Sequence, residues 1–118
     1  MKKIILVDDN KDFVEVEKEF IERLINDVEC ITFTRAFEVL FYLREGNKAD
    51  VLITDYEMPE LNGFDLAKIV NGEFQEIQII LSSGNDVKSM EKISFSLGLE
   101  NDVKIISKSN LEALIKII

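Results

Sequence analysis

The chain has 118 residues, of which 47% are hydrophobic, a length and composition typical of a single domain with a real core. Its 23 acidic and 14 basic residues give a formal net charge of -9, which argues against direct binding to nucleic acid or to anionic membranes. The chain contains no histidine, so a Ser-His or Cys-His nucleophile pair, an ordinary zinc site and an imidazole general base are all excluded.

The apolar residues are distributed as in a soluble cytoplasmic protein. The aliphatic runs, such as residues 4–7, are far shorter than the roughly 18 apolar residues that span a bilayer, and no charged and apolar leader precedes a cleavage site. Cys30 is the only cysteine, so it forms no internal disulfide and is expected to be a small buried thiol. We therefore expect one cytoplasmic domain over residues 1–118 that makes no membrane contact.

Five short apolar runs alternate along the chain with stretches patterned as helices. The runs predict strands at residues 4–7, 30–33, 51–54, 77–81 and 103–106. Such alternation predicts an α/β fold, with a doubly wound, five-stranded parallel sheet and five helices on its two faces. Right-handed crossovers commonly give such a sheet the flavodoxin-like strand order 2-1-3-4-5.

The helical stretches carry their own boundary and packing patterns. Gly46, Gly72 and Gly98 each follow a helical stretch and are expected to adopt the left-handed C-cap conformation. Ser109 and Glu112 have capping-box spacing and are expected to begin the last helix. The first helical stretch should pack on the sheet through a wide apolar stripe made of Phe13, Val16, Phe20, Ile21, Leu24 and Ile25.

One aromatic residue of the fourth helical stretch lies outside its apolar stripe. The stripe is defined by Val87, Met90, Ile93 and Leu97, and at about 100° per residue Phe95 points well away from it. Phe95 therefore either forms an exposed docking spot or packs against a neighbouring loop, and the sequence leaves both possibilities open.

Polar residues follow four of the five predicted strands. Asp8 and Asp9 follow the first strand, Asp55 follows the third, Ser82 ends the fourth and Lys108 follows the fifth. Ligands of sheets with this strand order bind at the carboxyl ends of the strands, beside the point where the order reverses. Each residue taken alone also fits a loop, cap or surface position, so the joint placement carries the prediction of a shared cleft.

The three carboxylates in this cleft would repel one another, which implies a bound cation. An all-oxygen ligand set suits Mg2+ better than zinc, which favours nitrogen and sulfur ligands. The ammonium group of Lys108 would neutralise part of the remaining negative charge. The sequence therefore indicates a magnesium site at the end of the sheet.

Four segments resemble the receiver domains of two-component response regulators, including the chemotaxis type, and the resemblance covers essentially the whole chain. Residues 4–10 (IILVDDN) resemble the opening strand and acidic pair of that family. Residues 51–63 (VLITDYEMPELNG) resemble its phosphoacceptor strand with the following Met-Pro and Gly, a highly specific motif. Residues 79–84 (IILSSG) and 105–108 (IISK) resemble the strands that end in a hydroxyl residue and in lysine.

This resemblance implies roles for the clustered residues. Asp55 would become an acyl phosphate, and the phosphoryl oxygens would be contacted by Ser82 and Lys108. Asp9 and Asp55 would bind Mg2+ directly, Asp8 would hold the ion largely through water, and the backbone carbonyl of Glu57 would complete the protein's share of the ligands. Phosphoryl transfer agrees with this set, because it needs positioning and cations more than a proton shuttle.

The resemblance also implies partners. Because the chain has no histidine, the phosphohistidine donor would be a separate sensor histidine kinase or histidine phosphotransfer protein. The output would be a downstream effector protein or a C-terminal output domain beyond Ile118, contacted through the fourth helix, fifth strand and fifth helix. The domain would be a phosphoacceptor that assists its own phosphorylation and dephosphorylation, rather than an enzyme.

Two positions depart from the family pattern. Ser109 stands where the family usually has proline, so we predict a trans peptide bond after Lys108, with Lys104 as a second candidate for its role. Ile105 stands where the family commonly has an aromatic residue that changes rotamer. Coupling would then run through Ser82 and loop movement, or the domain would be constitutive.

Two other functions remain open. A pseudo-receiver that serves only as an interaction scaffold is compatible with Ser109 and Ile105, although the acidic pair and Asp55 argue against it. An aspartate-nucleophile phosphatase of the haloacid dehalogenase type would carry Asp-x-Asp after the first strand. Here Asp8-Asp9-Asn10 stands at that place, and the best nucleophile candidate follows the third strand.

Overall fold

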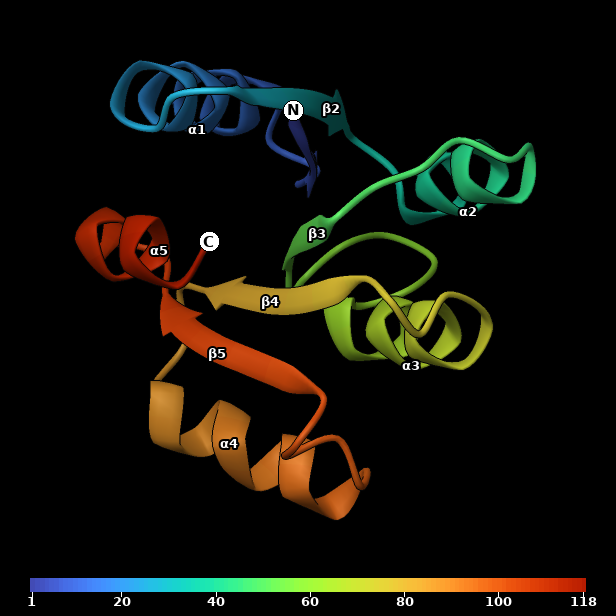
Figure 1. The fold of residues 1–118 in the computed structure, drawn as a ribbon. Helices are drawn as coiled ribbons and strands as arrows, with labels where there is room; N and C mark the ends of the chain where they lie inside the picture. Colours follow the sequence, from blue (N-terminus) through green and yellow to red (C-terminus); the bar gives the residue numbers. More distant parts are fainter.

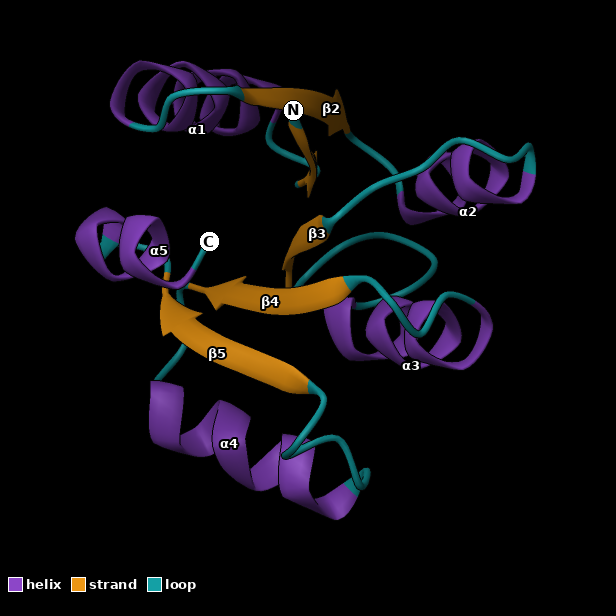
Figure 2. Ribbon diagram, viewed as in Figure 1, coloured by secondary structure: helices purple, strands orange, loops and turns teal.

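The computed structural model describes all 118 residues, and its five-stranded parallel sheet confirms the predicted α/β fold and strand order (Figures 1 and 2). The order across the sheet is β2-β1-β3-β4-β5. The strands are β1 (Lys2–Val7), β2 (Val28–Phe33), β3 (Val51–Asp55), β4 (Gln78–Ser83) and β5 (Val103–Ser107). The helices are α1 (Lys11–Leu24), α2 (Ala36–Arg44), α3 (Gly63–Glu73), α4 (Val87–Ser96) and α5 (Leu111–Ile117).

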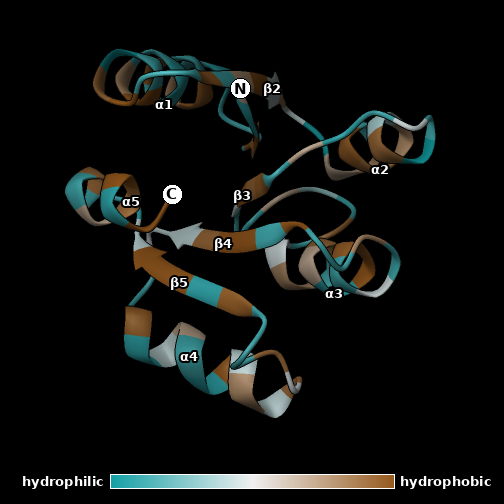
Figure 3. Ribbon diagram, in the orientation of Figure 1, coloured by the Kyte–Doolittle hydropathy of each residue, from teal (hydrophilic) through white to brown (hydrophobic).

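Helices cover both faces of the sheet and form two separate hydrophobic cores. One core joins the strands to α1 and α5, with Val14, Ile21 and Leu114 as the buried helix residues. The other joins them to α2, α3 and α4. Figure 3 shows the strands as largely hydrophobic along their length, as expected for a sheet buried on both faces. The free thiol of Cys30 is buried in the first core, as predicted.

The alternation of side chains along the strands determines which face receives the polar residues at their ends. In β3, Val51 and Ile53 belong to the α1 and α5 core, whereas Leu52 belongs to the opposite core. Because side chains alternate with a period of two, Asp55 faces the α1 and α5 layer. The same parity places Asp8, the residue after β1, on this face. Two acidic side chains thus share one side of the sheet.

The predicted stripe of α1 is wrong in part. The buried residues of the helix are Val14, Glu17 and Ile21, whereas Val16 and Leu24 are 60% and 55% exposed. One position on the buried face is occupied by Glu17. Because the prediction counted apolar residues only, the predicted stripe is rotated away from the true buried face towards solvent. The true inner face contains a carboxyl group that the sequence pattern assigned to solvent.

Two of the three predicted glycine C-caps are confirmed. Gly46 has φ of 97° and Gly98 has φ of 72°, in the left-handed region that glycine favours. The prediction for Gly72 is wrong, because α3 continues through it and ends when the N–H of Phe74 donates to the carbonyl oxygen of Val70.

The N-terminal cap of α5 differs from the prediction, although the helix begins at Leu111. The N-cap is Asn110, whose side-chain oxygen accepts a hydrogen bond from the N–H of Ala113 at 3.1 Å. The predicted capping box of Ser109 and Glu112 is therefore wrong, because Asn110 is the N-cap and the Ser109 hydroxyl pairs with that of Ser107 at 2.9 Å. The structure contains no cis peptide bond, which confirms the predicted trans bond before Ser109.

The buried face of α4 includes Ser94 and does not include Leu97, the last residue of the predicted apolar stripe. Met90 and Ser94 are buried, while Leu97 is 42% exposed, so including Leu97 in the stripe was wrong. Phe95 is 71% exposed, which excludes packing against a neighbouring loop. Its role as a docking residue stays a prediction. None of the five helices has the length and apolar character needed to cross a bilayer.

Gly63 begins α3 at a point of close backbone approach to the end of β3. Its N–H donates to the carbonyl oxygen of Tyr56 at 2.8 Å. A Cβ atom at this position would lie well inside contact distance of the Asp55 carbonyl oxygen and of the Leu81 side chain. Only glycine therefore allows α3 to start where it supports the strand that carries Asp55.

We predict that Gly63→Ala lowers the free energy of unfolding by about 1 to 3 kcal/mol, because the backbone or a packed leucine must move. Gly72→Ala is the matched control, since it lies within α3 with open space around it and should be neutral or stabilising by up to about 1 kcal/mol. Urea denaturation measures both changes. Equal stabilities of the two variants would contradict the close approach at Gly63.

Candidate functional site

Three aspartates meet at the carboxyl ends of the two central strands, as their positions in the sequence predicted. Asp8 and Asp9 follow β1, and Asp55 ends β3. Each offers one carboxylate oxygen, and these oxygens all lie within 4.8 Å of one another. Asp8 and Asp55 are buried, while Asp9 is exposed. The cluster therefore has two carboxylates that are shielded from water and one that is open to solvent.

Lys108 places its ammonium group directly among the carboxylates. Its Nζ lies 2.7 Å from Oδ2 of Asp8 and 3.4 Å from Oδ1 of Asp55. The backbone N–H of Lys108 donates to the carbonyl oxygen of Ser83 at 2.8 Å, so the sheet fixes where the side chain begins. Lys104, the second candidate, is exposed within β5 and makes no ion pair with the cluster. The residue that reaches the carboxylates is thus Lys108.

Burial and neighbouring charges shift the protonation equilibria of this group. Burial raises the pKa of Asp55, as does the charge of Asp8, and Lys108 only partly opposes them. Burial lowers the pKa of Lys108, but its hydrogen bond to Asp8 and the charges of Asp55 and Asp8 together raise that pKa above its ordinary value. Lys108 therefore stays charged, and the charge of Asp8 disfavours the ionised form of Asp55.

The donor set suits a hard divalent cation. Three carboxylates face a single ammonium group, so the cluster has an excess of negative charge that a dication can compensate. All the available ligand atoms are oxygens, which Mg2+ prefers. Glu57 borders both hollows at the cluster, one of about 160 Å³ beside Asp55 and Lys108 and one of about 470 Å³ beside Asp9. Asp55, Asp9 and Glu57 thus line hollows at the cluster, while Asp8 is buried beneath them.

Two serines end β4, and the structure separates them. Ser82 is paired in register with Asp55, is 4% exposed, and its hydroxyl has no hydrogen-bond partner. Ser83 lines the hollow beside Asp55, and its hydroxyl accepts a hydrogen bond from the N–H of Asn85 at 3.0 Å. The hydroxyl singled out from the sequence is thus in register with Asp55 and has no hydrogen-bond partner, while the neighbouring hydroxyl already accepts one hydrogen bond.

Three further residues at the site were missed in the sequence. The ring of Phe13 lies 4.5 Å from Nζ of Lys108, in a cation-π contact that helps hold the ammonium group. The side-chain amide of Asn85 donates to the Glu57 carboxylate at 3.3 Å. Glu17 lies on the buried face of α1. Position after a strand end could have identified Asn85, but the other two depend on the orientation of α1.

Glu17 is a fourth carboxyl group near the cluster. Its side chain is buried and Oε2 has no hydrogen-bond partner. Burial and the charges of Asp8 and Asp55, partly opposed by the charge of Lys108, together raise the pKa of Glu17 to about 7. The folded protein therefore holds a proton on Glu17 that the unfolded chain releases at a lower pH.

This shift predicts how stability depends on pH. The contribution of Glu17 is fully present below pH 4.5, its ordinary pKa, and is lost as the pH rises through about 7, because the folded state must then bury a charge. Glu17→Gln stays neutral, so its advantage in unfolding free energy over the wild type should grow by roughly 3 kcal/mol between about pH 5 and about pH 8. Urea denaturation in a metal chelator measures this.

Glu19→Gln is the control for this prediction, because Glu19 is exposed on the same helix. Its difference from the wild type should stay constant over the same pH range. Stability curves that run parallel for the wild type and Glu17→Gln would show that the buried carboxyl does not titrate in this range.

Comparison with known proteins gives one consistent result. The family model described as "Response regulator receiver domain" matches residues 4–118. The heme response regulator HssR of Staphylococcus saprophyticus is 30% identical over 87% of this chain and 44% of its own length. The chemotaxis protein CheY1 of Helicobacter pylori is 31% identical over 84% of this chain and 81% of its own length.

Comparison with solved structures also finds response regulators. The response regulator protein TrrA of Thermotoga maritima, solved in complex with Mg(2+)-BeF, superposes with a TM-score of 0.78 at 26% identity, covering 99% of this chain and 96% of that one. The chain spans between 16% and 44% of the longer curated regulators that it matches. A family match over nearly every residue, together with the five-stranded fold in the expected order, establishes that the chain belongs to the response regulator receiver domain family.

Proposed function

We propose that this receiver domain accepts a phosphoryl group on Asp55 from a sensor histidine kinase or a histidine phosphotransfer protein. The observation that carries the proposal is the placement of Asp55 among Asp8, Asp9 and Lys108, all within a few ångströms at one edge of the sheet. Phosphoryl transfer depends on positioning and on positive charge around the equatorial oxygens, and this arrangement supplies both once a cation is bound.

The residues that would hold Mg2+ are Asp8, Asp9, Asp55 and the backbone carbonyl of Glu57. When bound, the ion would neutralise charge on the carboxylates and on the incoming phosphoryl oxygens. Receiver domains generally bind Mg2+ at such an acidic pocket, and the three aspartates of this chain form one. Asp9, the exposed member, gives the ion a route from solvent.

The transfer itself needs few groups from this chain. A carboxylate oxygen of Asp55 forms a bond to phosphorus while the phosphorus–nitrogen bond of the donor phosphohistidine breaks, and the imidazole nitrogen leaves with the electron pair and takes a proton from solvent. Lys108, already 3.4 Å from Asp55, would pair with a phosphoryl oxygen. Ser82, whose hydroxyl is free, would donate to another.

In this proposal the domain is a phosphoacceptor that promotes its own phosphorylation and hydrolysis, rather than an enzyme that turns over a separate substrate. It would act in the cytoplasm, where the kinase domains of such relays lie. The output would be a downstream effector protein or an output domain that follows the receiver; the chain matches only part of the length of some curated regulators, which leaves room for such a domain in them. The new charge, roughly -1.5 to -2 for a phosphate ester, would change the surface of α4, β5 and α5.

Incubation with acetyl phosphate and Mg2+ tests the acceptor. We expect the intact protein to gain the mass of one phosphoryl group, and we expect neither Asp55→Asn nor wild type with a metal chelator to gain it. Asp102→Asn, a change at an exposed loop aspartate, is the control and should be modified like the wild type. Modification that persists in Asp55→Asn would exclude Asp55, and an unmodified wild type would favour a scaffold function.

A second test distinguishes the two serines of β4. Beryllofluoride with Mg2+ should shift the backbone amide resonances of α4 and β5 in the wild type and in Ser83→Ala, and these shifts should be strongly reduced in Ser82→Ala. The reason is that Ser82 is in register with Asp55 and alternates to the same face of the sheet, whereas Ser83, one residue later, alternates to the opposite face. The opposite order of effects would assign the phosphoryl contact to Ser83.

A further inference from the structure

The ammonium group of Lys108 has an aromatic contact in addition to its two carboxylate partners. Its Nζ lies 2.7 Å from Oδ2 of Asp8, 3.4 Å from Oδ1 of Asp55 and 4.5 Å from the centroid of the Phe13 ring. A cation at such a distance is attracted by the negative face of an aromatic ring. The aspartates belong to the proposed metal site, whereas Phe13 belongs to α1 and offers no ligand atom. Lys108 is therefore held by two groups that a metal ion would also bind and by one that it would not.

The start of α1, rather than Lys108, fixes the position of the Phe13 ring. Asn10 is the N-cap of the helix, and its side-chain oxygen accepts a hydrogen bond from the N–H of Phe13 at 3.1 Å. The N–H of Asn10 in turn donates to Oδ1 of Asp8 at 2.9 Å, while Oδ2 of the same carboxylate pairs with Lys108. These four residues form a closed circuit of contacts. The helix cap thus keeps the aromatic ring beside the cluster even when the lysine side chain moves.

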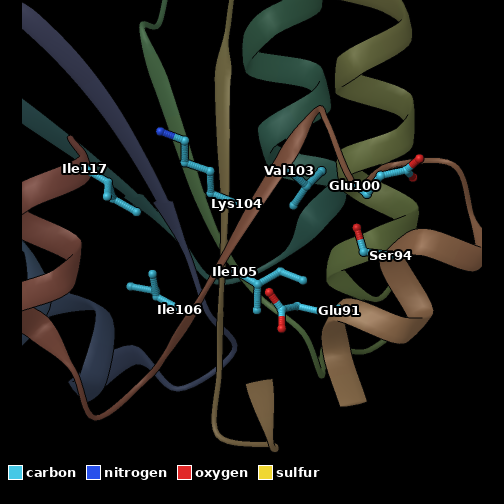
Figure 4. Close-up of a pocket in the computed structure, with 8 residues that line it drawn as sticks. All are labelled: Glu91, Ser94, Glu100, Val103, Lys104, Ile105, Ile106 and Ile117. Atoms are coloured by element: carbon cyan, nitrogen blue, oxygen red, sulfur yellow. The ribbon is translucent and has the colours of Figure 1, made fainter. Parts of the chain in front are cut away.

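The backbone of Lys108 does not by itself determine where the ammonium group lies. The sheet fixes only the start of the side chain, through the hydrogen bond from the N–H of Lys108 to Ser83. The stem beyond that point is long and flexible, and the side chain is 25% exposed, so the charge could also lie in solvent. Lys104 offers no replacement, because it lines a separate hollow of about 370 Å³ between α4, β5 and α5 (Figure 4). A phosphoryl group on Asp55 would then lack an ammonium partner.

The two carboxylate contacts of Lys108 would weaken once a divalent cation is bound. Asp8 and Asp55 would share their negative charge with the ion, and the ammonium group would be repelled by a second positive charge at the same cluster. The attraction to Phe13 does not depend on the charge of the carboxylates, because it comes from the electron distribution of the ring. The ring is thus the partner of Lys108 whose attraction a bound cation does not cancel.

We infer that Phe13 is a positioning residue for phosphoryl transfer, whose ring retains the ammonium group of Lys108 at the cluster while a divalent cation occupies the carboxylates. Phe13 is half-buried and the Lys108 side chain is mostly shielded, so water weakens their contact less than at an open surface. Phe13 acts through Lys108 rather than on the phosphoryl group. Its effect on rate rests on the proposed function, whereas the contact itself can be measured without phosphorylation.

NMR spectroscopy measures the contact with and without the cation. Protons over the face of an aromatic ring are shifted upfield by its ring current, so the Cε protons of Lys108 report whether the side chain stays over Phe13. Their resonance is identified by its absence from Lys108→Arg. We expect the upfield shift in a metal chelator and also at saturating Mg2+, and we expect Phe13→Leu to lack it. Phe20→Leu, the same change at another half-buried phenylalanine of α1, is the control and should keep it.

A graded series of rings at position 13 separates the attraction for the cation from packing. Fluorine atoms withdraw electrons from the ring face and change its shape little, so phenylalanines with one, two or three fluorine atoms weaken the attraction stepwise. With acetyl phosphate and saturating Mg2+, we expect the rate of mass gain to fall along the series. The trifluoro ring should give a rate about 2- to 5-fold below the wild type, as loss of one cation-π contact provides. The same rings at position 20 should leave the rate unchanged.

Three results would overturn the role of Phe13. The first is disappearance of the upfield shift when Mg2+ is added. The second is a slower Phe13→Leu with equal rates along the fluorinated series, which would show that the ring serves packing alone. The third is an equal rate in every variant. A wild type that gains no phosphoryl group would contradict the proposed function instead, and the shift at saturating Mg2+ would still decide whether Phe13 holds Lys108.

Discussion

The register between β1 and β3 is the constraint on which the functional site depends. Val7 pairs with Thr54, so the residues that follow, Asp8 and Asp55, lie side by side where both strands end. The two acids are 47 residues apart in the sequence, and only the central position of these strands in the sheet brings them together. A shift of either strand by one residue would turn one carboxylate to the opposite face. The apolar side chains of both strands, buried in separate cores, prevent that shift.

This arrangement creates an electrostatic problem that the rest of the site resolves. Like charges are held close together in a buried place, and Lys108 is the only ammonium group that pairs with them. Burial and mutual repulsion raise the pKa of Asp55 and bring that of Glu17 to about 7. A cation at the cluster would relieve the repulsion, and a proton on Glu17 relieves part of it without one. A proton on Glu17 and a cation at the cluster thus relieve the same repulsion, the proton at lower pH and the cation at higher pH.

The sequence was sufficient for those features that topology determines and insufficient for those that depend on the rotation of a helix. Strand order and chain position placed Asp55 and Lys108 at one edge, whichever way the helices turned. The inner face of α1 could not be predicted, because Glu17 occupies a core position that polarity assigns to solvent. Ser94 in place of Leu97 on the inner face of α4 has the same cause. In both cases a polar side chain occupies a buried position that the hydrophobic pattern assigns to an apolar residue.

The position of Ser82 connects the proposed phosphoacceptor to the edge strand of the sheet. Ser82 pairs in register with Asp55 of β3 on one side and with Ile106 of β5 on the other. In the proposed function, movement of Ser82 towards a phosphoryl group would pull on β4 and on the loop that leads from Ser83 to α4, the helix that carries Ser94. Ile105 is aliphatic at a position where the family commonly has an aromatic residue that changes rotamer. In the proposed function, coupling would therefore run through Ser82 and this loop, because β5 has no aromatic side chain at position 105 to carry it.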